Sequence, residues 1–290
     1  MTFLGVFSVI LSIAGHAVAA ASNSTPAVFE SFQSIVVLGK TAKPVTVWTY
    51  KPTLASPQSP ILFVMHGMER QPRRYLEPWI PYAERTGVLL AAPEFSKEHF
   101  PGSRNYNLGG IQAGRAVDGP LTETTYVAIE KFFDEFVKLS GNQSKAYRIY
   151  GHSAGAQFVH RMILLQPQTR IDLAVSANAG WYTLPSFEQP FPYGLTGSGA
   201  TVDGLRRALQ KKLIVLLGEK DRDPRHPSLN RSSQAMKQGE HRFARGETFF
   251  TTAKNQAEKL GVRVEWELKT VADAAHDNTA MARAAAALMR

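Results

Sequence analysis

Residues 151–155, read Gly-His-Ser-Ala-Gly, carry the clearest chemical signal of the chain. An apolar stretch ending at Tyr150 precedes them, and an amphipathic stretch from Gln157 to Leu165 follows. G-x-S-x-G between a strand and a helix is the setting of a nucleophile elbow, whose glycines leave room where strand and helix crowd together. The pattern predicts that Ser153 lies on a sharp, strained turn with its hydroxyl pointing out of the sheet edge. The other interpretation is a plain strand-to-helix turn made of small residues.

A serine hydroxyl is a weak nucleophile, so it needs a base within hydrogen-bond reach and an acid that orients the base. On an elbow of this kind the chain order is Ser, then Asp or Glu, then His. The apolar run at 213–217 predicts a buried parallel strand, and carboxylates follow it directly. We take Asp221 as the acid, with Asp223 and Glu219 as alternatives and a charged surface turn as the other interpretation.

The base should follow the last strand of the sheet. Residues 262–268 alternate apolar and charged side chains, which predicts an outer strand with one wet face. His276 comes after it, in a loop that leads into an Ala-rich helix at the C-terminus. A histidine in such a loop is usually solvated, but its place after Ser153 and Asp221, each at a strand end, favours the role of base.

Acyl transfer builds negative charge on the former carbonyl oxygen, which calls for an oxyanion hole. Residues 60–65 predict another buried strand, which runs into Gly67 and Met68. The expected donors are the backbone N–H groups of Met68 and Ala154, and Gly67 would let the backbone approach the substrate closely. Removing one such donor costs on the order of 10²–10³ in rate.

With these four features in order, the chain resembles the α/β-hydrolase superfamily of serine esterases. More narrowly, it resembles the exported esterases of the polyhydroxybutyrate depolymerase-like and feruloyl-esterase-like group. The narrower resemblance also uses the runs at 92–95, 100–103 and 106–109, and it covers residues 34–290. It implies cleavage of a small or polymeric carboxylic ester through an acyl-enzyme. The alternatives are a serine peptidase of the same fold, a polyester depolymerase and a non-catalytic binding protein.

The alternation of strand and helix patterns predicts an α/β fold with a mainly parallel sheet of about eight strands and helices on both faces. In such sheets ligands bind at the carboxyl ends of the strands, where all four features lie. The 290 residues suit one such domain, expected at 33–290. We expect strands at 33–39, 45–50, 60–65, 87–92, 147–151, 172–177, 212–217 and 262–268. We expect helices at 75–85, 122–139, 155–165, 202–210, 247–260 and 278–289.

The N-terminus has the pattern of an export signal, although no Lys or Arg precedes its apolar core. Phe3 to Ala14 is apolar, and small residues with an A-x-A pattern follow it. We interpret 1–21 as a cleaved signal peptide and 22–32 as a loose mature N-terminus, which predicts a periplasmic or secreted protein with no membrane span after cleavage. A retained hydrophobic anchor is the alternative. The chain has no cysteine, so its core alone must stabilise it.

The net charge is +9, and the Lys and Arg residues are spread along the chain. No nucleic-acid motif accompanies them, so we expect no nucleic-acid partner. The charge favours solubility and attraction to an anionic surface or polymer. No H-E-x-x-H, P-loop or strand-flanked G-x-G-x-x-G is present, so no metal or cofactor is implied. The sequence does not specify an oligomeric state.

The segment 181–194 holds five aromatic residues, three prolines and one charge. Proline stiffens a segment, and aromatic rings add apolar area at low entropic cost. We expect a wall or short lid over the acyl pocket, with Trp181 nearest the nucleophile. The alternative is a structural loop whose aromatic residues pack on the core. His152 is expected to fill a structural role behind the elbow.

Overall fold

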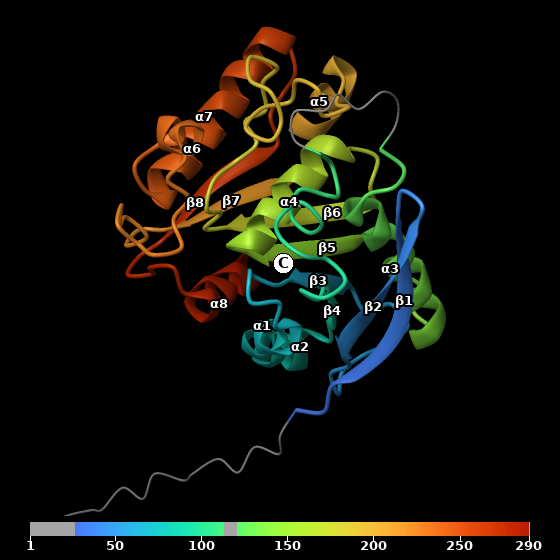
Figure 1. Ribbon diagram of the computed structural model, residues 1–290. Coiled ribbons are helices and arrows are strands. Elements are labelled where there is room, and N and C mark those ends of the chain that lie inside the picture. Colours follow the sequence, from blue (N-terminus) through green and yellow to red (C-terminus); the bar gives the residue numbers. More distant parts are fainter. Residues whose placement is uncertain (1–26, 113–120, 290) are drawn as a thin grey trace, which may run out of the picture.

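The computed structural model describes residues 27–112 and 121–289, so the expected signal peptide at 1–21 lies outside the described residues. The described chain builds an eight-stranded sheet in the order β1-β2-β4-β3-β5-β6-β7-β8, with helices on both faces (Figure 1). The expected α/β architecture is therefore confirmed. Strand β1 begins at Glu30, three residues before the domain boundary expected from the sequence.

The strands are β1 (Glu30–Leu38), β2 (Thr41–Tyr50), β3 (Ile61–Met65), β4 (Leu89–Glu94), β5 (Tyr147–His152), β6 (Ile171–Ala177), β7 (Leu213–Gly218) and β8 (Trp266–Val271). The helices are α1 (Pro72–Leu76), the 3-10 turn η1 (Glu77–Trp79), α2 (Ile80–Thr86), α3 (Thr125–Ser140), α4 (Ala154–Leu165), α5 (Val202–Leu209), α6 (Ser233–Gln238), α7 (Arg242–Leu260) and α8 (Asn278–Leu288).

Strand direction decides where the chemistry-bearing loops meet. Strand β2 pairs antiparallel with β1 and β4, whereas β3 to β8 run parallel to their neighbours. The carboxyl ends of β3, β5, β7 and β8 therefore share one edge of the sheet. The loops that leave this edge carry Met68, Ser153, Asp221 and His276.

Two apolar cores lie on the two faces of the sheet, because successive strand residues point to opposite sides. On β3, Phe63 belongs to the core shared with α3, α4, α5 and α7, whereas Leu62 and Val64 belong to the core shared with α1, α2 and α8. Strands β3, β5 and β7 are buried on both faces, and their near-continuous apolar runs are what made them recognisable in the sequence.

The structure differs from the expected elements in several places, among them an earlier start of β1 and of β2, and proline and tertiary packing account for two of the differences. The helix expected at 75–85 is divided into α1, η1 and α2, because Pro78 and Pro81 lack the N–H groups that a continuous helix needs. Strand β8 begins at Trp266 rather than at 262, and Val262 and Val264 pack on the core from the preceding loop. Helix α7 begins earlier than expected, and α6 was missed.

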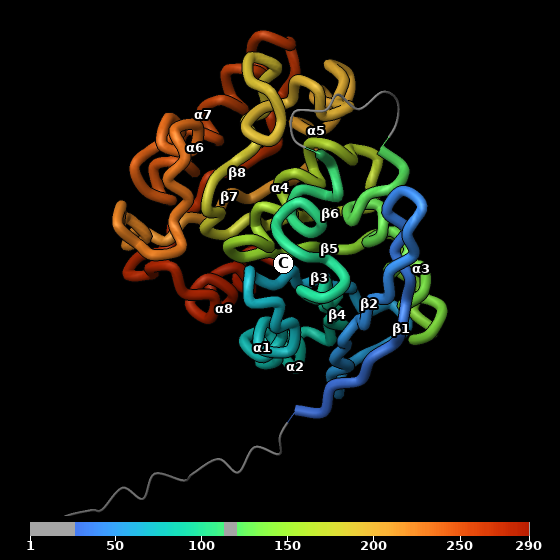
Figure 2. Tube along the Cα trace, in the orientation of Figure 1, coloured from blue at the N-terminus to red at the C-terminus, as the bar shows by residue number. Residues whose placement is uncertain are grey.

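Hydrogen bonds to α2 and β5 fix the carboxyl end of the C-terminal helix α8. The Met289 carbonyl accepts hydrogen bonds from the Tyr82 hydroxyl and, at 2.6 Å, from Arg148 Nη1. Figure 2 shows this red helix beside the teal α1–α2 segment. Because His276 directly precedes α8, docking of the helix also restrains the loop that carries His276.

A buried histidine organises the loop after β3. His66 Nε2 accepts the Phe95 N–H at 3.2 Å, and its Nδ1 lies 3.0 Å from the Gly67 carbonyl. The ring is therefore neutral, with its proton on Nδ1. Burial lowers the pKa of His66 to about 3, and the charge of Arg70 acts in the same direction.

A second neutral histidine lies inside α4. His160 Nε2 accepts the Thr183 N–H at 3.1 Å, and its Nδ1 lies 3.0 Å from the Ala156 carbonyl. Burial lowers the pKa of His160 well below its usual value, and the neighbouring Arg161 adds to this. The bond to Thr183 anchors the start of the aromatic segment 181–194 to the helix that follows Ser153.

We expect these histidines to make the fold sensitive to acid. Their folded pKa values lie below the unfolded value of about 6.5, so their contribution is fully present above that pH and is lost as the pH falls. Each should lower the free energy of unfolding by up to about 1.4 kcal/mol per pH unit once the pH is below 6.5. Urea unfolding at pH 7.5, 6.5 and 5.5 measures this slope.

His160→Gln should reduce the slope by about one proton. An identical slope in His160→Gln and the unsubstituted protein would show that His160 is not held neutral.

Candidate active site

Close backbone packing builds the turn that carries Ser153. A Cβ atom on Gly151 would lie 2.2 Å from the Gly155 carbonyl oxygen, and one on Gly155 would lie 2.1 Å from the Met65 carbonyl oxygen. Both positions therefore require glycine. Ser153 itself has φ 58° and ψ −114°, a left-handed conformation that side chains rarely adopt. Helix α4 starts at the next residue, so the hydroxyl stands at the sheet edge.

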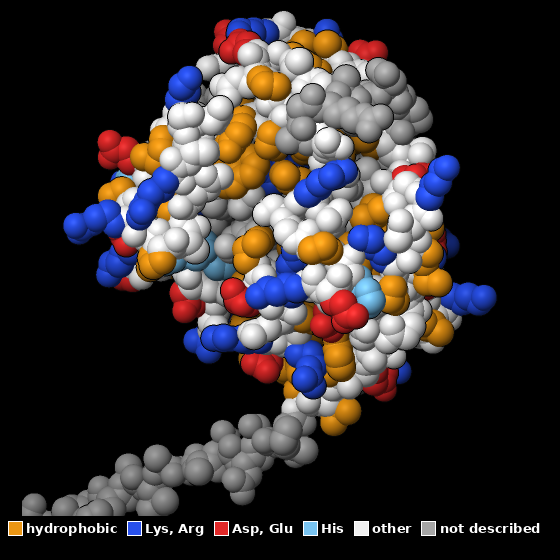
Figure 3. Space-filling view, viewed as in Figure 1, with side chains coloured by type: hydrophobic (Ala, Val, Ile, Leu, Met, Phe, Trp, Pro, Cys, Tyr) orange, Lys and Arg blue, Asp and Glu red, His pale blue; other side chains and the backbone are white. Residues whose placement is uncertain are grey.

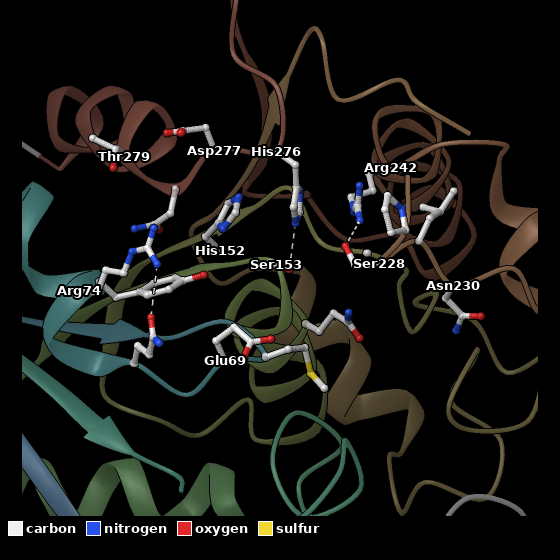
Figure 4. A pocket seen from close by; sticks show the side chains of 18 of the residues that line it. Glu69, Arg74, His152, Ser153, Ser228, Asn230, Arg242, His276, Asp277 and Thr279 are labelled. Atoms are coloured by element: carbon white, nitrogen blue, oxygen red, sulfur yellow. Dashed lines mark hydrogen bonds between the residues drawn. The ribbon is translucent and has the colours of Figure 1, made fainter. Parts of the chain in front are cut away.

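The structure brings the three residues expected for nucleophile, base and acid into one hydrogen-bonded row. His276 Nε2 lies 3.0 Å from Ser153 Oγ (Figure 4), and His276 Nδ1 lies 2.7 Å from Asp221 Oδ2 on its other side. An ionised carboxylate can only accept, so Nδ1 carries the proton and Nε2 is free to accept the serine proton. This is the tautomer that general-base catalysis requires.

The two alternative carboxylates lie elsewhere. Asp223 is exposed, and its Oδ1 accepts the Arg225 N–H at 2.8 Å. Glu219 accepts the Thr270 hydroxyl at 2.7 Å across to strand β8. Of the three acids that follow β7, only Asp221 contacts His276.

Asp221 is buried, and its two carboxylate oxygens bond different partners, His276 and Arg242. Its Oδ1 accepts a hydrogen bond from Arg242 Nη1 at 3.1 Å, in an ion pair with both side chains at most 3% exposed. Burial raises the pKa of Asp221, but the hydrogen bond to His276 and the charges of His276 and Arg242 outweigh it and lower the pKa overall. The carboxylate therefore stays ionised at neutral pH.

Arg242 also connects Asp221 to the cleft wall, a role that was not predicted from the sequence. Its Nη2 donates to Ser228 Oγ at 2.8 Å and lies 3.2 Å from His226 Nδ1. Ser228 lines the same cleft as Ser153, and Figure 4 shows its bond to Arg242. The loop at 224–230 is thus held by the guanidinium that holds the carboxylate.

Asn178 is a second unexpected residue, and it joins the loops of the acid and the base. It follows β6 in a left-handed conformation with φ 49°. Its Oδ1 accepts the Gly218 N–H at 2.7 Å at the end of β7, and its Nδ2 donates to the Ala275 carbonyl at 2.9 Å. One buried amide therefore fixes the distance between the strand end before Asp221 and the residue before His276.

His152 lies behind the row, as expected for a structural residue. Its ring centroid is 4.6 Å from that of His276, and neither of its nitrogens has a hydrogen-bond partner among the described residues. Burial lowers its pKa well below the usual value, and the charges of His276 and Arg242 add to this. A neutral ring at this place packs against the imidazole of His276 without competing for its hydrogen bonds.

Both residues expected to supply oxyanion donors lie at the sheet edge that carries Ser153. Ala154 opens α4, where backbone N–H groups have no partner within the helix. Met68 follows β3 and lines the cleft. The space that a side chain at Gly67 would take is filled by the hydroxyl of Tyr75, 2.3 Å from a built Cβ. Burial raises the pKa of Tyr75 to about 12, so this cleft-lining hydroxyl stays protonated.

A cleft of about 690 Å³ opens over Ser153, within the size range of small-molecule sites. Trp181 lines it, is 9% exposed and packs on Tyr193 with ring centroids 4.7 Å apart. The neighbouring Tyr182 stacks on Phe249 in the core. Of the segment 181–194, only Trp181 lines the cleft, whereas residues 182–186 are buried in the packed interior. Most of the segment is therefore a structural loop, and the contribution of Trp181 to substrate binding stays a prediction.

Among residues 27–112 and 121–289, no group of three His, Asp or Glu side chains could hold a metal ion. In the same part of the chain, no helix combines the length and apolar character needed to cross a membrane.

The chain is similar to solved structures along nearly its whole length. Poly(aspartic acid) hydrolase-1 from Sphingomonas sp. KT-1 is 40% identical with a TM-score of 0.85, over 90% of this chain and 97% of that one. A poly(3-hydroxybutyrate) depolymerase from Bordetella parapertussis is 33% identical with a TM-score of 0.82, over 89% of each chain. An S-formylglutathione hydrolase from Agrobacterium tumefaciens, 14% identical with a TM-score of 0.55 over 90% of this chain and 92% of that one, shares the fold alone. No protein-family model and no curated protein matches the chain.

We expect Asn178→Ala to misplace the base relative to the nucleophile. The change leaves the Gly218 N–H and the Ala275 carbonyl without their partner, which costs about 1–3 kcal/mol of unfolding free energy for each group that stays buried. The rate at which a fluorophosphonate labels Ser153 should fall about tenfold or more, because a small displacement of a catalytic group has a large effect on rate.

Asn142→Ala is the control, since Asn142 is a buried asparagine that bonds the Ser59 carbonyl at 2.8 Å, away from the row. It should lose stability while Ser153 keeps its reactivity. Equal labelling rates in the two variants would contradict the positioning role of Asn178.

Proposed function

The chain belongs to the α/β-hydrolase superfamily, in the group of esterases and hydrolases that includes poly(3-hydroxybutyrate) depolymerase-like enzymes, and we propose that it cleaves carboxylic esters as a serine hydrolase. The observation that carries the proposal is the row Ser153–His276–Asp221, with its contacts of 3.0 and 2.7 Å. The row supports acyl transfer because base and nucleophile are within hydrogen-bond reach before any substrate binds.

In the proposed reaction, Ser153 Oγ attacks the ester carbonyl while His276 Nε2 takes its proton. Asp221 holds the tautomer and stabilises the imidazolium that forms. The alcohol leaves with the proton from His276, and an acyl-enzyme remains on Ser153. Water then attacks the acyl group while His276 Nε2 takes its proton. His276 returns this proton to Ser153 Oγ as the carboxylic acid leaves, which restores the serine.

The N–H groups of Met68 and Ala154 are proposed to hold the oxyanion of the tetrahedral intermediate. Support comes from their positions, one on the loop after β3 and one at the start of α4, on the two sides of Ser153. Donors fixed by the fold need no reorganisation as the charge develops, which is why such holes contribute strongly to rate.

Cleavage of an amide is the second candidate, because the same row serves serine peptidases. The observation that favours it is the 40% identity with a hydrolase named for poly(aspartic acid), a polymer linked by amide bonds. A polyester depolymerase is the remaining variant of the ester proposal, favoured by the 33% identity with such an enzyme. We also propose that the chain is exported, on the basis of the apolar run at 3–14.

We expect the unsubstituted protein to turn over p-nitrophenyl esters faster than peptide anilides, because the anilide is the more stable bond. A panel with acyl chains of increasing length, peptide anilides and a polyester film separates the three candidates. Turnover of the anilides alone would replace the ester proposal with the amide one.

Ser153→Ala should lower kcat by about a million-fold, the loss found when the nucleophile of such a unit is removed. It should also abolish labelling by a fluorophosphonate, read by mass spectrometry. Ser103→Ala is the matched control, since Ser103 lines the same cleft. Full esterase activity in Ser153→Ala would overturn the proposal.

We expect Trp181→Ala to change acyl selectivity, because it removes a rigid ring from the cleft wall. The ratio of kcat/KM for p-nitrophenyl octanoate over acetate should change by about tenfold, in keeping with the effect of reshaping an apolar pocket. Phe187→Ala, at a half-buried position of the same segment, should leave the ratio unchanged. Unchanged turnover of both esters in Trp181→Ala would exclude the wall from substrate binding.

A further inference from the structure

Four buried arginines surround the cleft, and their charges are poorly compensated. Arg70, Arg161, Arg242 and Arg245 are each at most 6% exposed. Within the described residues, only Arg242 forms an ion pair, with Asp221. A buried charge without a counter-ion is costly to keep, so three of them around one cleft require a physical explanation.

Arg161 lies directly behind the floor and one wall of the cleft. Its Nη1 donates to Gln157 Oε1 at 3.2 Å, and its Nε donates to the Thr183 hydroxyl at 2.8 Å. Its guanidinium carbon stands 4.3 Å from the ring centroid of Trp181. Gln157 and Trp181 both line the cleft, and Arg161 Nη2 has no partner among the described residues.

Arg245 holds two further lining residues by their backbone. Its Nη1 donates to the Gly180 carbonyl at 2.7 Å, and its Nη2 donates to the Asn230 carbonyl at 2.8 Å. Gly180 and Asn230 both line the cleft. Gly180 directly precedes the aromatic segment 181–194, and Asn230 belongs to the loop at 224–230 that Arg242 holds. The partners of Arg245 are neutral carbonyls, so its charge is solvated by dipoles but not cancelled.

Arg70 stands on the loop after β3, between the cleft-lining residues Glu69 and Gln71, and its own side chain borders the adjoining pocket with Trp48. Its Nη2 donates to the Gly102 carbonyl at 2.9 Å and its Nη1 to the Phe95 carbonyl. Its guanidinium carbon lies 4.2 Å from the ring centroid of Tyr106. Here too the hydrogen-bond partners are neutral.

The guanidinium groups keep their charge despite burial. Burial lowers the pKa of Arg161 and of Arg245 to about 10, and it lowers the pKa of Arg70. Values of about 10 leave Arg161 and Arg245 protonated at neutral pH. The four arginines therefore place four positive charges around the cleft, against the one buried carboxylate of Asp221.

The other carboxylates that line the cleft cannot cancel this excess. Glu69, Glu77 and Asp277 are exposed at the rim, and Glu69 pairs with Lys97 at 2.9 Å. Water and salt screen charges at the rim, whereas charges behind low-dielectric walls act over a longer range. On the face that Figure 3 shows, Lys and Arg side chains are scattered among Asp and Glu side chains.

We propose that the cleft takes an ester whose acyl part carries a negative charge, such as a carboxylate, and that the four buried arginines set this preference through their field. The inference rests on the proposed ester hydrolysis and names its substrate class. Clefts with charges of one sign behind low-dielectric walls focus the field and concentrate oppositely charged ligands.

A purely structural role for these arginines is the competing explanation. The chain does supply carboxylates to an arginine elsewhere, since the less buried Arg170 pairs with Glu130 at 2.7 Å and with Asp134 at 2.6 Å. Arg148, which does not line the cleft, also lacks a carboxylate partner among the described residues and bonds only the Tyr82 hydroxyl and the Met289 carbonyl, but it is half-buried. Arg70, Arg161 and Arg245 differ from it because they are at most 6% exposed, so water compensates their charges least, and a substrate carboxylate can supply the missing counter-charge.

The test compares two esters of similar size on the unsubstituted protein: mono-4-nitrophenyl adipate, which carries a carboxylate, and 4-nitrophenyl heptanoate, which is neutral. With uncatalysed rates subtracted, kcat/KM for the adipate should exceed that for the heptanoate by about tenfold or more at low salt, and the ratio should fall as NaCl is added. A ratio of one or less would overturn the charge preference. Failure of both esters would instead contradict the proposed function.

The variants separate field from structure. Arg161→Met and Arg245→Met should each reduce the adipate-to-heptanoate ratio several-fold, and Arg161→Lys and Arg245→Lys should retain it. Arg263→Met, at an exposed arginine, changes the net charge equally and should keep the ratio. If the Met variants slow both esters by the same factor, these arginines only support the cleft walls. Because the ratio is measured within each variant, losses common to both esters cancel.

Discussion

The tight contact between the elbow and strand β3 is the constraint on which the rest of the site depends. Gly155 lets the start of α4 approach the Met65 carbonyl, and Gly151 lets it approach its own strand. The same contact fixes two things at once. It forces Ser153 into its left-handed conformation at the sheet edge, and it sets helix α4 beside the loop that carries Met68. Nucleophile and proposed oxyanion donors are thus positioned by one piece of packing, before any side-chain hydrogen bond is formed.

The remaining geometry is organised around Asp221, whose two oxygens serve different parts of the molecule. One oxygen orients His276, and the other holds Arg242 at the start of α7, where the Phe243 N–H also bonds the Asp221 carbonyl at 3.2 Å. Through Arg242, Asp221 therefore connects the end of strand β7 to the cleft wall at 224–230. Because the partners of the base are fixed by buried bonds, the imidazole orientation is determined by the fold rather than by the substrate.

The sequence was sufficient for Ser153 and His276, because a local motif and the chain order identify them, and it restricted the acid to the carboxylates that follow β7. It was not sufficient for the residues that position them. Asn178 acts on Ala275, which is 97 residues away, and nothing in its own neighbourhood signals that contact. The choice of Asp221 over Asp223 likewise depended on which carboxylate the turn after β7 directs inward. The start of β8 shows the same limit, because only the second half of the alternating pattern at 262–268 is strand. Val262 and Val264 precede the strand and pack on the core instead of pairing in the sheet.

The buried arginines illustrate why charge composition alone could not reveal the character of the cleft. Spread along the sequence, they read as part of a dispersed basic surface; the fold gathers them behind one cavity. Arg245 bonds Gly180 and Asn230, and Arg161 bonds Gln157. The side chains that define the shape of the cleft therefore also carry the charges that produce its electric field. A planar guanidinium can join two wall segments at once, which a lysine ammonium cannot do with the same geometry. Shape and charge are therefore coupled at this site. Arginines that join the wall segments also bring buried charges without counter-ions, and this arrangement costs stability.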